Sequence, residues 1–359
     1  MGDDLNSPIS LQEAKRLFAA LRVLPAIVLG VSGGPDSLAL MLLIARWRRT
    51  LARGPRLLAI TVDHGLRSEA AREARQVKRL ARELDVEHRT LRWTGTKPKT
   101  GVPAAARAAR YRLLVRDARA AGASHIVTAH TRDDQAETLL MRLLRGSGIT
   151  GLSAMARETE RDGIMLTRPF LDVPKSRLVA TLNKAGIAFA DDPTNRDVFF
   201  TRPRLRSLLS ALAAEGGDAR TFARLAARLA RANAAVEVLT DGAAHYLLLK
   251  DGATAEIGGS NSDGRSFDAE AFAAMPEEIR LRLLMRAIDR FGHEGPAELG
   301  KVEGLLAQLD RKLAEGAGMP SAKRTHLILK QTLAGALVSV RRGRICIEPA
   351  PPRRAVRSN

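Results

Sequence analysis

The sequence predicts an α/β protein in which a parallel, doubly wound sheet domain is followed by a mainly helical domain with a small terminal β element. Three observations lead to this prediction. Apolar runs of the buried-strand type alternate with segments of helical period through the first 150 residues, which is typical of a parallel sheet covered on both faces. Clusters of glycine and polar residues follow several of these runs. Beyond residue 150 the alternation stops, and long stretches rich in Ala, Arg and Leu dominate.

Four apolar runs in the first half predict buried strands, because they are short, contain β-branched residues and end at turn-forming residues. The predicted strands cover residues 26–31, 57–62, 88–93 and 125–129. Helical periodicity around and between them predicts helices at residues 11–23, 38–47, 68–84, 104–121 and 133–144. The binding or active site of such a sheet is expected beyond the carboxyl ends of the strands.

The second half is predicted to be mainly helical. We expect helices at residues 175–186, at 202–239 with a break near 215–217, at 276–291 and at 298–314. Residues 252–265 predict a loop or hairpin, and the alternating stretch 326–348 predicts a hairpin or small sheet. These patterns divide the chain into a first domain at 1–210, a mainly helical domain at 211–325, and a β element with a loose Pro/Arg-rich tail at 326–359.

The composition indicates a polyanionic partner. The chain has 359 residues, with 58 Lys and Arg against 39 Asp and Glu, and a formal net charge of +19. Only 4% of the residues are aromatic, which favours contacts to phosphates over stacking on single-stranded bases. The single cysteine, Cys346, excludes a disulfide framework and cysteine-rich metal sites. The absence of a long apolar run or a signal-peptide pattern predicts a cytoplasmic protein that does not cross a membrane.

The strongest motif is Ser32-Gly-Gly-Pro-Asp-Ser37, between the first predicted strand and the next helix. Its two glycines can adopt backbone angles closed to other residues and leave room for an anion. Backbone N–H groups at a helix N-terminus, together with two serine hydroxyls, make a phosphate site. The motif is neither a Walker A loop nor the dinucleotide fingerprint. Asp36 would repel a phosphate, so it is expected to hold Mg²⁺ or to orient the nucleotide.

Two further pairs of residues suit the chemistry of a phosphate site. Arg107 and Arg110 lie three residues apart on a predicted helix, so they share a face that either presents two fixed cations or is an ordinary solvated surface. His130 follows the fourth predicted strand, and Asp134 lies in the first turn of the next helix. A histidine and a carboxylate there suit Mg²⁺ binding and stabilisation of a leaving group, although acids at a helix N-terminus are also ordinary caps.

The six-residue motif resembles the pyrophosphate loop (PP-loop) of the N-type ATP pyrophosphatases. The resemblance implies an adenine nucleotide alpha hydrolase-like sheet that uses ATP and Mg²⁺ and adenylates a carbonyl oxygen. It implies that Asp36 and Asp134 hold the Mg²⁺. The ATP contacts that it implies are Ser32, Gly33, Gly34, Pro35, Asp36, Ser37, Val62, Asp63, His64 and Ala129.

Residues 26–206 resemble the catalytic domain of the tRNA(Ile)-lysidine synthetase family, through Val62-Asp-His-Gly-Leu-Arg67, the stretch around His130, Arg145-Gly-Ser-Gly148 and Asp192-Pro-Thr-Asn195. The resemblance implies an AMP-forming carbon–nitrogen ligase. Cytidine 34 in the CAU anticodon of tRNA(Ile) would be adenylated at its C2 oxygen and attacked by free L-lysine, giving lysidine, AMP and pyrophosphate. The implied catalytic residues are Asp36, Arg107, Arg110, His130 and Asp134, and the implied RNA contacts are Arg145, Arg202, Arg204 and Arg206.

The resemblance also implies that the second domain binds tRNA, and it is compatible with a homodimer. The chain departs from the family at Pro203, where members often have asparagine, so the basic stretch around it is expected to contact RNA differently. Two alternatives stay open. The chain could be another adenylating tRNA-modifying enzyme of the 2-thiolation type, although one cysteine argues against it. It could also be a non-catalytic basic tRNA-binding protein with a relic ATP site.

Overall fold

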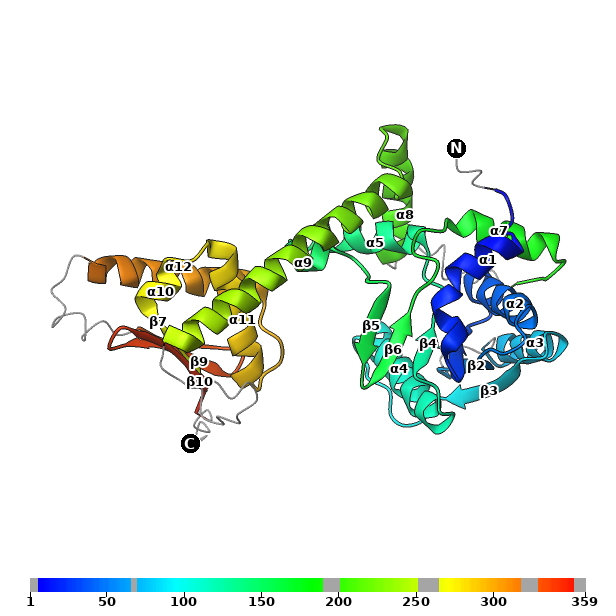
Figure 1. The fold of residues 1–359 in the computed structure, drawn as a ribbon, viewed down its shortest axis with the longest axis horizontal. Coiled ribbons are helices and arrows are strands. Elements are labelled where there is room, and N and C mark those ends of the chain that lie inside the picture. The colour runs from blue at the N-terminus through cyan, green and yellow to red at the C-terminus, as the bar shows by residue number, and fades with distance from the viewer. Residues whose placement is uncertain (1–5, 66–69, 190–200, 251–264, 318–328, 352–359) are drawn as a thin grey trace. The chain divides into compact units, whose positions relative to one another are not determined.

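The computed structural model describes residues 6–65, 70–189, 201–250, 265–317 and 329–351 (Figure 1). The chain divides into two compact units, which we describe separately. The first unit comprises residues 1–146 and 150–230, and the second comprises residues 147–149 and 231–359. The Asp192–Asn195 motif lies outside the described residues.

A six-stranded sheet forms the centre of the first unit, with the strand order β3-β2-β1-β4-β6-β5. The strands are β1 Ala26–Gly30, β2 Arg56–Asp63, β3 Glu87–Arg92, β4 His125–Val127, β5 Glu158–Arg161 and β6 Ile164–Thr167. All neighbouring strands run parallel except β5, which pairs antiparallel with β6. The predicted parallel sheet is confirmed, and β5 and β6 add an edge that was not expected from the sequence.

Helices cover both faces of this sheet (Figure 1). The helices from the N-terminus to the start of the second unit are α1 Leu11–Leu17, the 3₁₀ helix Ala19–Val23, α2 Pro35–Arg49, α3 Ala70–Glu83, α4 Val102–Ala120, α5 Arg132–Leu143, α6 Ile149–Leu152, α7 Lys175–Lys184, α8 Thr201–Ala214 and α9 Ala219–Lys250; α8 and α9 do not pack on the sheet, and α9 continues into the second unit. Helices α1, α2, α3 and α7 contribute to one apolar core, which includes Phe18, Trp47 and Phe170. Helix α4 contributes Tyr111 and Leu114 to a separate core. The two cores confirm the doubly wound arrangement.

Local sequence signals account for where these helices begin and end. Gly34 caps α2 with Pro35 as its first residue, and Thr131 and Asp134 form a capping box at the start of α5. The predicted break in the long helix is confirmed, because α8 ends at Ala214 and α9 begins at Ala219. Gly216 adopts a positive φ of 84° between them, which favours glycine.

The second unit packs helices against a four-stranded antiparallel sheet with the order β7-β10-β9-β8. Its further elements are β7 Arg265–Asp268, α10 Ala269–Ala273, α11 Glu277–Phe291, α12 Leu299–Ala317, β8 Leu329–Leu333, β9 Ala336–Arg341 and β10 Arg344–Pro349. One apolar core joins the helices and this sheet, and it includes Phe267, Phe272, Leu305 and Ile345. The expected small terminal sheet is confirmed, whereas β7 and α10 were not expected.

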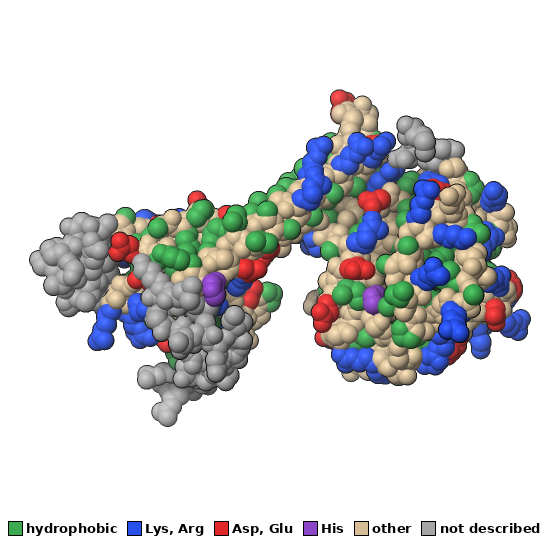
Figure 2. All heavy atoms as spheres, viewed as in Figure 1, with side chains coloured by type: hydrophobic (Ala, Val, Ile, Leu, Met, Phe, Trp, Pro, Cys, Tyr) green, Lys and Arg blue, Asp and Glu red, His purple; other side chains and the backbone are tan. Residues whose placement is uncertain are grey.

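Among the described residues, no helix is both long and apolar enough to cross a bilayer. Lys and Arg side chains are spread over the face of the first unit that Figure 2 shows.

Candidate active site

A cavity of about 530 Å³ lies at the carboxyl ends of β1, β2 and β4. The residues after these strands line it together with the first turns of α2, α3, α5 and α7, as expected for a parallel sheet. Its lining includes Ser32, Gly34, Pro35, Asp36, Ser37, Val62, His64, Glu73, Arg110, Ala129, His130, Asp134, Lys175 and Arg206. Residues from four sequence motifs therefore meet in one place.

The loop from Ser32 to Ser37 is held in shape by its own hydrogen bonds. The hydroxyl of Ser37 accepts from the Ser32 amide at 3.1 Å and donates to the Gly34 carbonyl at 3.0 Å. Gly33 adopts a φ of 86°, a region that side chains disfavour. The positive end of the 15-residue helix α2 follows directly at Gly34. This arrangement can bind a phosphate with little reorganisation.

Asp36 is an ionisable group in an unfavourable environment. Burial, together with the nearby carboxylate of Asp134, raises the pKa of Asp36 to about 6 against the opposing charge of Lys175. The Lys175 ammonium lies 3.2 Å from Oδ2 of Asp36. The other oxygen, Oδ1, is buried without a hydrogen-bond partner. A buried carboxylate oxygen of this kind is suited to bind a cation.

The donor set fits Mg²⁺ shared with a phosphorylated ligand. Asp36 offers its buried oxygen, and Asp134 contributes a second carboxylate close enough to influence the pKa of Asp36. Within the described ranges, no group of three or more His, Cys, Asp or Glu side chains is placed to enclose a metal ion. Mg²⁺ commonly takes one or two carboxylates and completes its shell with water and substrate phosphates. The residues present fit that mode.

Asp134 also has a structural role. Its Oδ2 accepts hydrogen bonds from the Thr131 amide at 2.8 Å and from the Thr131 hydroxyl at 3.0 Å. These contacts cap α5 and fix the direction in which the carboxylate points. The metal and capping interpretations that the sequence left open are therefore compatible at this residue.

His130 is held in its neutral form. Burial lowers the pKa of His130 to about 3, against the opposing charge of Asp134. The positive charges of Arg110, Arg168 and Arg107 act in the same direction as burial. Nδ1 lies 2.9 Å from the Thr128 hydroxyl. His130 is thus suited to hydrogen bonding, and the positive charge beside it comes from the arginines.

The protonation of His130 gives a direct test. Because its pKa lies near 3, we expect the ring nitrogens of His130 to show no titration between pH 5 and 8 in the ligand-free protein. Long-range ¹H–¹⁵N NMR spectra of histidine-labelled protein would measure this, with His130→Gln assigning the signal. A protonation midpoint above pH 5 for His130 would contradict the electrostatic account of the cavity.

Three arginines lie around the ring of Tyr111. The guanidinium carbons of Arg107, Arg110 and Arg161 lie 5.1, 5.0 and 4.7 Å from the ring centroid of the buried Tyr111. Burial raises the pKa of Tyr111, but the charges of Arg110 and Arg107 bring it below its usual value. Rings can hold guanidinium groups in place through cation–π contacts. Of the three arginines, Arg110 also lines the cavity and brings positive charge to its wall.

Arg206 lines the cavity and forms an ion pair with a buried carboxylate. Its Nε lies 2.5 Å from Oε1 of Glu137, whose side chain is only 4% exposed. Arg206 comes from α8 and Glu137 from α5, so the pair joins these two helices. The RNA contact predicted for Arg206 stays a prediction, but the structure gives this residue a second role inside the protein.

The remaining predicted site residues lie outside the cavity lining. Asp63 accepts a hydrogen bond from the Gly65 amide at 2.8 Å and so shapes the turn after β2. Gly33 shapes the phosphate loop, and Arg107 lies beside Tyr111. Arg145 and Arg204 are exposed, and the side chain of Arg202 is outside the described residues.

Sequence reasoning missed Lys175. It is the first residue of α7, where its amide donates to Asp133 at 2.8 Å and its ammonium contacts Asp36. A signal was available, because a cation in the first turn of a helix opposes the helix dipole and needs a compensating anion. Arg161 and Arg168 were also missed, since β5 and β6 were not recognised.

The fold and the phosphate loop define a nucleotide-binding protein of the PP-loop class, and comparisons with known proteins agree. Residues 7–212 match the PP-loop domain family. The tRNA(Ile)-lysidine synthase of Bradyrhizobium diazoefficiens is 70% identical over 99% of this chain and 98% of its own length. The tRNA(Ile)-lysidine synthase of Rhodopseudomonas palustris is 61% identical over 96% of each chain. The U34-tRNA thiolase NcsA from Methanococcus maripaludis, solved with its [4Fe-4S] cluster, shares the fold at a TM-score of 0.53. It is 17% identical, and the match covers 61% of this chain and 79% of that one.

The chain belongs to the tRNA(Ile)-lysidine synthase family within the PP-loop proteins. Membership of this family implies the use of ATP.

Proposed function

We propose that the chain is an ATP-dependent, AMP-forming ligase that converts cytidine 34 in the CAU anticodon of tRNA(Ile) to lysidine in the cytoplasm. One observation carries the proposal: the phosphate loop, Asp36, Asp134, Arg110 and His130 line the same cavity. The high identity to relatives named tRNA(Ile)-lysidine synthase supports the choice of tRNA(Ile) and lysine as substrates.

The proposed reaction has two steps. The C2 oxygen of the cytidine attacks the α-phosphorus of ATP, and pyrophosphate leaves. This converts a poor leaving group into AMP. The ε-amine of free L-lysine then attacks C2, loses a proton, and displaces AMP to leave a C–N bond. The cytidine base must be turned out of its stack to enter the cavity, as bases of single-stranded loops readily are.

The chain's residues would bind and orient the phosphates. Backbone N–H groups of the Ser32–Ser37 loop and the α2 N-terminus would hold the phosphates that leave as pyrophosphate. The positive charge of Arg110 and Arg107 would stabilise the charge that develops at the α-phosphate. His130 would donate a hydrogen bond as a neutral ring, with its orientation fixed through Thr128.

Mg²⁺ fits this proposal as a ligand of Asp36 and Asp134. When bound, it would offset the negative charge of the phosphates and of the leaving pyrophosphate. Asp36 is ionised at pH 7, because the pKa of its carboxyl is about 6, and would be protonated progressively below that pH. The carboxylate form that binds a cation is therefore available at neutral pH.

Arg145 and Arg204 are exposed and are proposed to contact tRNA phosphates, together with Arg202 and the basic second domain. Such contacts make binding strongly dependent on salt. The family resemblance also makes a homodimer the assembly to test, which light scattering would measure directly.

The test is a purified-protein assay with ATP, Mg²⁺, radiolabelled lysine and a tRNA(Ile) transcript that carries a CAU anticodon. We expect label in the tRNA together with release of AMP and pyrophosphate. The label should disappear with a transcript in which cytidine 34 is replaced by uridine.

The other outcomes separate the alternatives. AMP release that depends on tRNA, without incorporation of lysine, would support the adenylation step. It would point to a different nucleophile, as in the alternative of a 2-thiolation enzyme. Binding of tRNA with neither release of AMP nor label in the tRNA would contradict the proposed enzyme activity. It would favour the alternative of a non-catalytic RNA-binding protein. One cysteine in the whole chain, Cys346 in β10, makes the thiolation outcome the less expected of the two.

A further inference from the structure

A row of cations runs along α3, beyond the cavity lining. The row consists of Arg72, Arg75, Lys78, Arg79 and Arg82, and we call it the α3 cation row. All five side chains are exposed. Arg72, Arg75, Arg79 and Arg82 follow one another at spacings of three and four residues, which places them on one helix face. The opposite face of α3 is buried through Ala74, Val77, Leu80 and Ala81.

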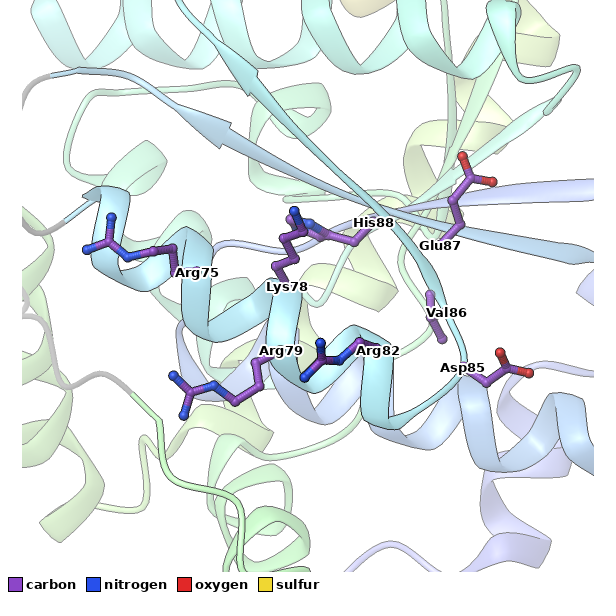
Figure 3. Close-up of a pocket in the computed structure, with 8 residues that line it drawn as sticks. All are labelled: Arg75, Lys78, Arg79, Arg82, Asp85, Val86, Glu87 and His88. Carbon is purple, nitrogen blue, oxygen red and sulfur yellow. The ribbon is translucent and has the colours of Figure 1, made fainter.

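Four members of the row line a hollow of about 610 Å³ between α3 and the start of β3 (Figure 3). Asp85, Val86, Glu87 and His88 complete the lining. In Figure 3 the carboxylates of Asp85 and Glu87 point away from the cations of α3. The carboxylate of Glu87 pairs with Arg89 at 2.8 Å. The hollow therefore presents an excess of positive charge on its α3 side.

The members of the row differ from many other arginines of the protein in having no anionic partner. Within the described part of the chain, none of the five side chains forms a hydrogen bond or ion pair. By contrast, Arg157, Arg177 and Arg280 each pair with a carboxylate. Like charges one helical turn apart repel each other and destabilise a helix. A row of unpaired cations thus costs stability, which an external anionic partner would recover.

We propose that the α3 cation row binds the phosphate backbone of the RNA substrate outside the catalytic cavity. This inference rests on the proposed function for the identity of the RNA. The hollow contains no Phe, Tyr or Trp, so it can contact phosphates but cannot stack bases. A membrane surface is the weaker candidate, because the apolar face of α3 is used in the protein core and is not available for insertion.

The position of α3 relative to the cavity supports an RNA partner. Ala70 and Glu73 in the first turns of the helix line the catalytic cavity, and the cations lie further along the same helix. At 1.5 Å per residue, Arg82 is about 14 Å along the axis from Glu73. An RNA that places one base in the cavity would have flanking phosphates within reach of the row.

The test is the salt dependence of tRNA binding by the full chain. The variant carries Arg75→Ala, Arg79→Ala and Arg82→Ala. Fluorescence anisotropy with labelled tRNA(Ile) measures Kd over a roughly six-fold range of salt, from about 50 to 300 mM KCl, and the slope of log Kd against log salt concentration is the salt slope. Each lost phosphate contact should reduce the salt slope by about 1, so we expect a slope lower by about 3 and a Kd at least about 10-fold weaker at low salt. A tRNA of another identity should lose affinity equally, because phosphates carry no sequence information.

A matched control removes the same charge elsewhere. Lys15, Arg16 and Arg22 are exposed, and the variant with all three changed to Ala should keep most of the wild-type slope. Alanine has the highest helix propensity, so both variants are expected to fold. An unchanged slope in the α3 variant, or an equal loss in the control, would overturn the proposal. So would loss of binding to phosphatidylserine vesicles with tRNA binding intact, which would assign the row to a membrane surface.

The two proposals can fail separately. If the wild-type protein does not incorporate lysine but the salt slope of the α3 variant is still lower by about 3, the RNA contact is supported and the proposed function is wrong. If lysine is incorporated and the slope is unchanged, the proposed function stands and the α3 assignment is wrong.

Discussion

Asp36→Asn is expected to lower lysine incorporation by about 100-fold or more while leaving the first unit as stable as the wild type, or more stable, at pH 7. The loss follows because an amide cannot supply the negative charge that Asp36 offers to a cation beside the phosphates. The gain in stability follows because the wild-type carboxylate is ionised at pH 7 in a buried site that disfavours its charge. The same environment raises the pKa of Asp36 from 3.8 to about 6.

The sign of the effect on stability depends on pH. Above pH 6 the carboxyl is ionised in both the folded and the unfolded state, and its burial costs stability. Below about pH 4 it is protonated in both states and the cost disappears. A shift of one pKa unit corresponds to about 1.4 kcal/mol. Since Lys175 loses its partner in the variant, we expect a gain of up to about 2 kcal/mol at pH 7 that vanishes near pH 4.

Tryptophan fluorescence isolates this effect. Both tryptophans, Trp47 and Trp93, lie in the first unit, so thermal unfolding followed by their emission reports on that unit. The control is Asp172→Asn, which removes an exposed carboxylate paired with Arg157 and should change neither activity nor Tm appreciably. A Tm for Asp36→Asn well below that of the wild type at pH 7 would contradict the account and make Asp36 a structural residue.

Arg206→Ala is expected to destabilise the first unit by about 2–3 kcal/mol, because it removes an ion pair from the buried carboxylate of Glu137. The expected loss of stability is smaller than for a fully buried ion pair, because the Arg206 side chain is 38% exposed. For a unit of this size, the loss corresponds to a fall in Tm of about 5–10 °C. The same fluorescence measurement applies.

Two variants test the cause of that loss. Adding Glu137→Gln to Arg206→Ala should recover part of the stability, because it removes a buried charge that has lost its ion pair with Arg206. Arg224→Ala removes an exposed arginine from helix α9 of the first unit and should leave Tm nearly unchanged. If Arg206→Ala weakens tRNA binding and leaves Tm intact, the ion pair is unimportant for stability and the RNA contact predicted from the sequence is favoured.

The parts of the fold that could be predicted are those whose sequences carry a strong local signal. The strand at Ala26–Gly30 is a continuous apolar run, and the motif that follows begins within a few residues of its end. Strand β5 could not be recognised, because Glu158–Arg161 has no apolar member and lies at the edge of the sheet. Strand β6 is only four residues long, which is too short to show a period.

The residues of the candidate site likewise divide into those with a local sequence signal and those without one. Ser32 and His130 were predictable because each comes within three residues of the end of a strand at the functional edge of the sheet, and Asp134 because it lies in the first turn of the helix that follows. Lys175 and the pair of Glu137 with Arg206 depend on tertiary contacts between helices far apart in the chain. No short-range pattern reports such contacts. The neutral state of His130 likewise depends on burial and on arginines from several elements.

The shared use of Asp134 has a consequence for how substitutions are tolerated. One of its oxygens caps α5 through Thr131, and the residue also lies in the cavity, so any replacement disturbs folding and chemistry together. Asp36 pairs with Lys175 but its side chain caps no helix, so its replacement by an amide separates folding from chemistry. In a library of single substitutions sorted for abundance and for activity, position 36 should yield abundant, inactive proteins, whereas position 134 should yield few proteins that are abundant at all.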